Sequence, residues 1–139
     1  MDNKTRKEKL LSESCGVCVY CGHKVDFNTM EVEHIIPLSK GGPDIIENNV
    51  CSCHECNASK KDMLPQEFYA AMTPKRHKAF LNRLNNLALT EHMTLAKRRL
   101  LLNGKPRPVE ILEDNSRIQI ELGQIAWKSL VLVLSIKTM

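Results

Sequence analysis

Two pairs of cysteines with the same short spacing restrict the fold of this chain more than any other feature. Two residues separate Cys18 from Cys21, and two separate Cys53 from Cys56. A turn of this kind presents two thiolates, and two such turns supply the four tetrahedral ligands that zinc takes in structural sites. The sequence therefore predicts one structural Zn²⁺ bound by Cys18, Cys21, Cys53 and Cys56.

Two further cysteines leave an alternative open. Two residues also separate Cys15 from Cys18, and one residue separates Cys51 from Cys53. Cys18 and Cys21 are preferred for the first turn because Gly22 follows Cys21, which is typical of a zinc knuckle. The roles of Cys15 and Cys51 stay open from the sequence.

The composition indicates a globular chain whose core needs stabilisation beyond apolar burial. Of 139 residues, 42% are hydrophobic and only 4% are aromatic, which excludes collagen-like or wholly disordered chains and favours a metal-supported core. Residues 1–14 lack the apolar run of a signal peptide, and the longest apolar stretch, 130–136, is far short of the about 20 residues that span a bilayer. We therefore expect a cytoplasmic protein with no membrane partner, in a reducing compartment that favours metal binding over disulfides.

The pattern along the chain predicts four segments: an N-terminal helix in 1–14, a metal-binding core in 15–62, a basic helical extension in 63–108 and a β-like tail in 109–139. A β-branched stretch at 29–36 is typical of a strand. Thr73 followed by Pro74 predicts a helix start, as does Thr90 for the next helix, which ends near Gly104. Alternating residues in the tail predict a possible C-terminal β-hairpin.

Positive charge is concentrated in the segment 61–108. Residues 61–108 carry ten basic and three acidic side chains, whereas the whole chain has a net charge of +4. A basic segment between acidic ones is the electrostatic pattern of a polyanion-binding surface, although a solvated helix face has the same composition.

The segment between the cysteine pairs carries the most specific motifs. It reads YCG, then EHIIPLSKGG, then a downstream asparagine, then CHECNASK. Over about residues 15–62 this order resembles the HNH endonuclease family, in its zinc-bound branch and with Asn at the last motif position. The resemblance implies an α+β fold, in which a ββα-metal core with a four-cysteine zinc site is followed by helices.

The resemblance also implies roles for individual residues. His34 matches the general base, and Asn48 matches the middle asparagine that steadies the loop and the base, with Asn49 as an alternative register. Glu33 and Asn57 match the ligands of a catalytic divalent ion. Their oxygen atoms favour Mg²⁺ or Mn²⁺ over zinc at this site.

Three basic side chains near these motifs each have more than one candidate role. Lys40 and Lys60 are candidates for binding substrate phosphate, and the alternatives are a plain turn and a helix surface. His54 lies inside the second cysteine pair and is either solvent-facing, a zinc ligand or a second catalytic histidine.

Taken together, the motifs predict a metal-dependent endonuclease. It would hydrolyse DNA phosphodiester bonds with a histidine base and one divalent ion, leave 5′-phosphate and 3′-hydroxyl ends, and contact the phosphate backbone with low sequence specificity. The alternatives are a non-catalytic, zinc-stabilised nucleic-acid-binding module and a zinc-stabilised protein adaptor.

Overall fold

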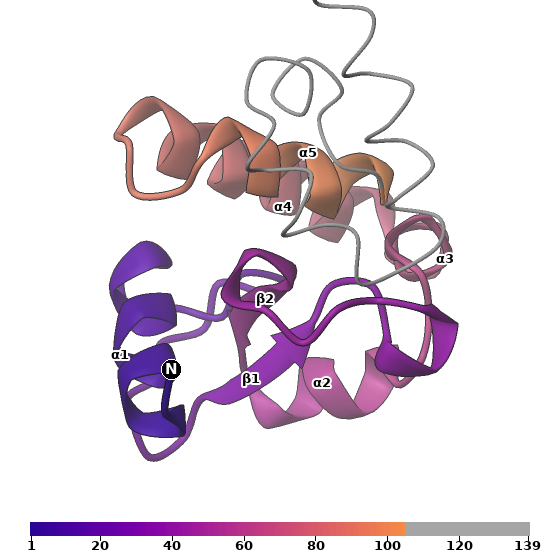
Figure 1. The fold of residues 1–139 in the computed structure, drawn as a ribbon. Coiled ribbons are helices and arrows are strands. Elements are labelled where there is room, and N and C mark those ends of the chain that lie inside the picture. Colours follow the sequence, from indigo (N-terminus) through magenta and orange to yellow (C-terminus); the bar gives the residue numbers. More distant parts are fainter. Residues whose placement is uncertain (105–139) are drawn as a thin grey trace, which may run out of the picture.

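The computed structural model describes residues 1–104 of the chain (Figure 1). Within these residues, no helix is both long and apolar enough to cross a membrane. The expected tail at 109–139, with its possible hairpin, lies outside the described residues. The elements are, in chain order, α1 (Asn3–Glu13), β1 (Glu31–His34), β2 (Asn49–Ser52), α2 (His54–Lys60), α3 (Pro65–Ala70), α4 (Pro74–Leu89) and α5 (Leu95–Asn103).

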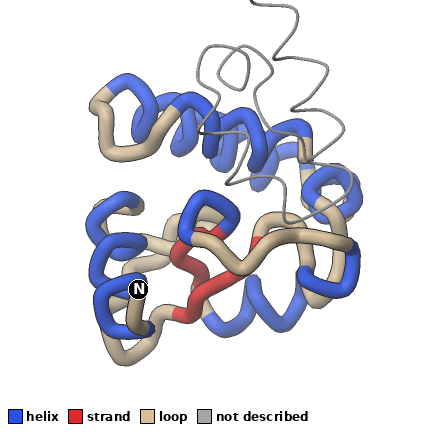
Figure 2. The backbone as a smooth tube through the Cα atoms, viewed as in Figure 1, coloured by secondary structure: helices blue, strands red, loops and turns tan. Residues whose placement is uncertain are grey.

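The two strands form a small antiparallel sheet that supports the predicted α+β class. Glu31 pairs with Ser52 at one end and His34 with Asn49 at the other. Figure 2 shows the strands in red, joined by a long loop that contains two short 3₁₀ turns, Leu38–Lys40 and Ile46–Asn48. The helix α2 follows β2 directly, which completes a ββα arrangement.

The helix starts follow local capping chemistry. The hydroxyl of Thr73 accepts a hydrogen bond from the backbone N–H of Arg76, and Thr94 accepts one from Lys97, as side-chain caps do. The expectation that Thr90 starts the last helix is wrong. The Thr90 hydroxyl does not accept a hydrogen bond from a following backbone N–H, as a helix start would require; it donates to the carbonyl of Asn86. Thr90 therefore ends α4, and Thr94 starts α5.

One hydrophobic core joins the cysteine turns to the later helices. The ring of Tyr20 lies 5.1 Å from that of Phe68 in α3 and 5.8 Å from that of Phe80 in α4, between ring centroids. Ile35 from the loop after β1 and Leu84 from α4 are fully buried in the same cluster. Figure 1 shows α4 and α5 lying together along one side of the molecule, where their apolar faces cover this core.

Helix α1 packs on the sheet through a second, smaller cluster. Leu10 is buried there with Met30 and Cys51. The C-terminal end of α1 is joined to α5 by an ion pair, in which Nζ of Lys97 lies 2.9 Å from a carboxylate oxygen of Glu13. Burial raises the pKa of Glu13, and the charge of Lys97 opposes that rise. Helix α1 is therefore part of the folded unit.

The loop between the strands is held by one amide. Asn48 accepts a hydrogen bond from the N–H of Ile36 and donates to the carbonyls of Ile36 and Pro43, each at 3.0 Å. Gly42 passes so close that an added Cβ would overlap the Ile36 carbonyl and lie 2.9 Å from the Asn48 amide. The loop therefore has no room for a side chain at position 42.

We predict that Gly42→Ala lowers the free energy of unfolding by about 2–3 kcal/mol, because the methyl group must displace backbone. Gly16→Ala is the matched control: it meets only the carbonyl of Val25 at 4.0 Å, but it also has a positive φ of 75°. The control should lose about 1 kcal/mol from backbone conformation alone. Urea denaturation followed by far-UV circular dichroism measures both, and equal losses would contradict the close approach.

Candidate active site and four-cysteine cluster

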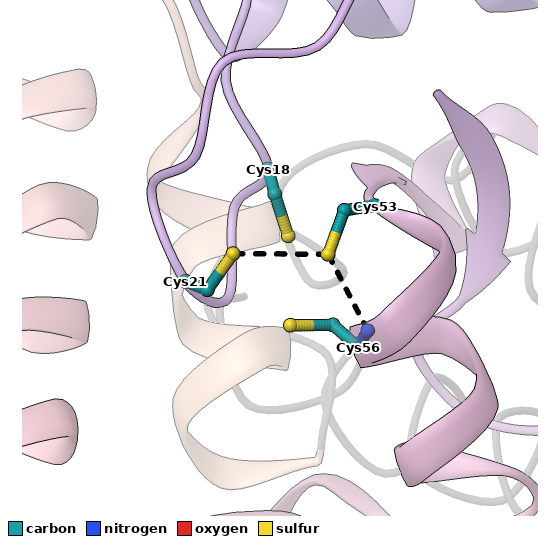
Figure 3. Close-up of side chains that lie close together, drawn as sticks. All are labelled: Cys18, Cys21, Cys53 and Cys56. Carbon is teal, nitrogen blue, oxygen red and sulfur yellow. Dashed lines mark hydrogen bonds between the residues drawn. The ribbon is translucent and has the colours of Figure 1, made fainter. Parts of the chain in front are cut away.

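The two cysteine pairs converge as the spacing predicts. Figure 3 shows Cys18 and Cys21 on the first turn facing Cys53 and Cys56 at the start of α2. The four sulfur atoms all lie within 4.8 Å of one another. The turn is closed by an isolated β-bridge between Val17 and Lys24. Cys15 is exposed and Cys51 is buried near α1, so neither joins the cluster.

The thiol electrostatics fit a cation. A hydrogen bond from Cys56 lowers the pKa of Cys18 to about 4. The same hydrogen bond raises the pKa of Cys56, while burial raises that of Cys53 to about 11. Four thiols packed this closely cannot all ionise unless a positive ion compensates the charge, and zinc deprotonates thiols that coordinate it. The cluster is therefore compatible with a structural zinc.

Two arginines of α4 lie beside the cluster. Nη2 of Arg76 lies 3.9 Å from Sγ of Cys56. Arg83 donates from Nη1 to the carbonyl of Val19 at 2.9 Å and packs against Gly22 in the first turn. Zinc with four thiolates carries a net charge of −2, so these cations face the negative charge of a loaded site. Outer contacts of this kind tune metal affinity.

We predict that Arg76→Met weakens zinc binding about 10-fold, because a cation beside Cys56 is lost while the exposed helix face tolerates methionine. The control is Arg99→Met, since Arg99 is exposed on α5. Competition with a chromophoric zinc chelator measures both affinities. Equal affinities for the two variants would show that Arg76 does not stabilise the metal-bound thiolates.

A separate cavity of about 320 Å³ lies at the end of β1, against α2. It brings together three residues that the motifs single out, Glu33, His34 and Asn57, from a strand and the following helix. Three apolar and three polar or charged residues complete the wall. Its lining residues are Val32, Glu33, His34, Pro37, Leu38, Ser39, Asn57, Lys61 and Asp62.

Glu33 differs from a simple metal ligand because it is only 3% exposed and already bonded. Its Oε1 accepts a hydrogen bond from Nζ of Lys60 at 2.8 Å, and its Oε2 accepts one from the hydroxyl of Tyr20 at 2.6 Å. Burial raises the pKa of Glu33, and the Lys60 charge opposes the rise. The carboxylate thus anchors β1 as well as lining the cavity.

Lys60 does not reach the surface, contrary to the expectation that it contacts substrate. It is fully buried, and its ammonium group also donates to the carbonyls of His34 and Ile35, each at 3.0 Å. Lys60 lies about one helical turn after Asn57, on the face of α2 that packs against β1, so its side chain points at that strand. Lys40 remains accessible and pairs with Glu67 at 3.1 Å.

Glu31 is a site residue that the motifs did not single out. Its Oε1 accepts a hydrogen bond from Nδ2 of Asn57 at 2.6 Å, which leaves the carbonyl oxygen Oδ1 of Asn57 as the group free to act as a ligand. Its Oε2 bonds Nδ1 of His54 at 2.7 Å. His54 is thus a largely exposed partner of Glu31 and lies outside the four-cysteine cluster. The period-two pattern, which places Glu31 on the face of Glu33, was the available signal.

Two hydrogen bonds favour the ionised form of Glu31. The hydrogen bond from Asn57 lowers the pKa of Glu31, and the contact with His54 lowers it further. The same contact raises the pKa of His54. An ionised Glu31 keeps the Asn57 amide turned with its nitrogen toward β1.

His34 contacts an acidic residue of the loop. Its Nε2 lies 2.9 Å from Oδ1 of Asp44, and the same oxygen lies 2.7 Å from Nη1 of Arg6 in α1. Asn48 does not bond the His34 side chain; its amide fixes the loop that carries Asp44. Within residues 1–104, neither side-chain polar atom of Asn49 has a hydrogen-bond partner. Asn48, and not Asn49, is therefore the asparagine that holds the loop.

We predict that Lys60→Met lowers the free energy of unfolding by about 3–5 kcal/mol, because it leaves the buried carboxylate of Glu33 without its cation. A carboxyl with a raised folded-state pKa loses stability as pH rises through that pKa, so the defect should shrink in acid. Denaturation midpoints across pH measure it.

The control for that experiment is Lys78→Met, which removes a lysine from the exposed face of α4. Adding Glu33→Gln to Lys60→Met should recover much of the loss, because no unpaired charge then remains. A single variant as stable as Lys78→Met would contradict the role of the buried pair.

Comparison with known proteins agrees with this geometry. The sequence model described as HNH endonuclease matches residues 18–73. The CRISPR-associated endonuclease Cas9 of Corynebacterium diphtheriae is 38% identical over 56 residues, which are 40% of this chain and 5% of that protein. The type IV methyl-directed restriction enzyme EcoKMcrA of Escherichia coli is 39% identical over 57 residues, covering 37% of this chain and 21% of that enzyme.

A solved structure agrees at the level of the fold. The type II-C Cas9 enzyme from Actinomyces naeslundii superposes with a TM-score of 0.51 and 22% identity, over 60% of this chain and 10% of that one. The chain therefore spans only a small part of the larger proteins it matches. Over residues 18–73 it contains a domain of the HNH endonuclease family, whose two cysteine pairs fit the zinc-bound branch of that family.

Proposed function

We propose that this chain is a metal-dependent endonuclease that hydrolyses DNA phosphodiester bonds. The observation that carries the proposal is the cavity at the end of β1, where His34 meets Glu33 and Asn57. An imidazole is a suitable proton acceptor, and carboxylate and amide oxygens suit a hard divalent cation, so the residues of this cavity support that reaction. The match of residues 18–73 to HNH endonucleases supports the same reaction class.

His34 is the proposed general base. Its side chain is 25% exposed, so it reaches both the cavity and solvent. A neutral imidazole takes a proton from water at physiological pH, and such general-base action contributes about 10²–10⁴-fold to a rate. His34 would take the proton of the water as the water oxygen attacks phosphorus. The bond to the 3′ oxygen then breaks, and that oxygen takes a proton from solvent, giving 5′-phosphate and 3′-hydroxyl ends.

Asn57 and Glu33 are the proposed ligands of the catalytic ion, with Mg²⁺ or Mn²⁺ favoured by their oxygen donors. Glu31 holds the amide nitrogen of Asn57, which leaves Oδ1 free to bind the ion. Each oxygen of Glu33 has a lone pair beyond the one that accepts its hydrogen bond. When bound, the ion offsets phosphate charge and stabilises the leaving oxygen.

The remaining features fit this role. A structural zinc at the four cysteines would fix the first turn against α2. The accessible Lys40 is the proposed contact with the DNA phosphate backbone, a mode with little sequence preference. The matched relatives are named as an endonuclease and a restriction enzyme. Unpaired cysteines suit the reducing cytoplasm that we propose as its location.

We predict that His34→Ala lowers the rate of DNA cleavage by about 10²–10⁴-fold while zinc content and unfolding free energy change little. Conversion of supercoiled plasmid to nicked or linear forms, with Mg²⁺ or Mn²⁺, measures the rate. His77→Ala is the control, because His77 lies on α4 away from the cavity.

EDTA should abolish cleavage by the parent protein. Cleavage by His34→Ala at the parent rate would remove His34 from the reaction. A zinc-loaded parent protein that binds DNA but cuts none with any divalent ion would instead support the non-catalytic binding module.

A further inference from the structure

The contact between His34 and Asp44 has no part in the reaction described so far. Nε2 of His34 lies 2.9 Å from Oδ1 of Asp44, which in turn lies 2.7 Å from Nη1 of Arg6. Asp44 belongs to the loop between the strands. Arg6 belongs to α1, which precedes the residues matched to the HNH family. Three segments distant in sequence therefore meet at the proposed base.

We propose that Asp44, held by Arg6, is a positioning residue that fixes His34 in the tautomer with a proton on Nε2. Nδ1 is then the nitrogen that accepts the proton of the attacking water. This inference rests on the proposed function for its catalytic consequence, whereas the tautomer itself is a property of the folded chain.

Hydrogen-bond chemistry determines the tautomer. An ionised carboxylate only accepts hydrogen bonds, so Nε2 must be the donor in a contact of this length. A neutral imidazole carries one proton, and Nδ1 is then left with a free lone pair. The hydrogen bond with His34 lowers the pKa of Asp44, and so does Arg6, which keeps this carboxylate ionised near neutral pH.

The position of Asp44 is fixed from two sides, although its side chain is 61% exposed. On one side, the amide of Asn48 donates to the carbonyl of Pro43, the residue directly before Asp44. On the other, Arg6 is only 18% exposed and extends from a helix that packs on the sheet. An exposed ion pair alone contributes little, but here both neighbours restrict where the carboxylate can lie.

A contact of this kind affects rate through orientation. Misplacing a catalytic group by about 1 Å can cost on the order of 10²-fold. Loss of Asp44 frees the imidazole to rotate and to exchange tautomers. Loss of Arg6 leaves the hydrogen bond in place but loosens Asp44. The defect of an Arg6 variant should therefore be smaller than that of an Asp44 variant.

The test compares the parent protein with Asp44→Ala, Arg6→Met and a control, Lys9→Met. Lys9 is exposed on the same helix, so its variant removes the same charge as Arg6→Met. Imidazole proton–nitrogen correlation spectra are recorded on zinc-loaded, ¹⁵N-labelled proteins about two units above the ordinary histidine pKa. Plasmid cleavage and DNA affinity are measured on the same samples, and zinc content confirms that each variant is folded.

We expect the parent and Lys9→Met to show a slowly exchanging His34 proton on Nε2 and an unprotonated Nδ1. Asp44→Ala should lose that slow proton and cleave on the order of 10–100-fold more slowly, with DNA affinity unchanged. Arg6→Met should keep the proton with faster exchange and cleave a few-fold more slowly than Lys9→Met.

A parent spectrum with the proton on Nδ1, or Asp44→Ala cleaving at the parent rate, would overturn the proposal. The spectra remain decisive if the parent cuts no DNA. The slow Nε2 proton would then still establish that Asp44 orients His34, while the absence of cleavage would count against the proposed function alone.

Discussion

A single buried ammonium group holds together the part of the structure on which the proposed site depends. Nζ of Lys60 bonds the Glu33 carboxylate and the carbonyls of His34 and Ile35, which ties α2 to the end of β1. Backbone carbonyls at the end of a strand need partners when they are buried. Here a helix side chain supplies them, so the strand can end beside the cavity and present His34 there without further sheet. The same interaction turns Glu33 toward α2, and Glu33 and Asn57 line the same cavity.

The matched segment is stabilised by helices that lie outside it. The rings of Phe80 and Tyr20 pack together, which joins α4 to the first cysteine turn. Arg76 approaches the sulfur of Cys56 from the same helix, and Arg6 reaches the loop from α1. A small ββα unit with two four-residue strands has little apolar surface of its own to bury. Flanking helices and a four-cysteine cluster supply what the short strands cannot.

The sequence predicted the parts of this structure that follow from local pattern. The paired cysteines, with Cys18 at the first turn, and the helix start at Thr73 depend on spacing and capping within a few residues, and they are found where expected. Asn48 was expected to steady the loop, and its amide does bond that loop. The sequence could not predict which partner a charged side chain finds across the fold. Both Lys60, in the last motif, and Asp44, in the segment between the motifs, are charged residues whose partners the sequence does not indicate. In the structure Lys60 is buried against Glu33, and Asp44 bonds the proposed base.

The proposed reaction depends on one divalent ion that binds in the cavity between β1 and α2. Titration of Mn²⁺ into zinc-loaded, ¹⁵N-labelled protein tests it directly, because the paramagnetic ion broadens amide signals near its site. We expect saturable broadening confined to residues 31–34 and to the segment around Asn57 and Asp62, with the same pattern weakened in Asn57→Ala. Broadening that is centred elsewhere, or that is unchanged in Asn57→Ala, would contradict it.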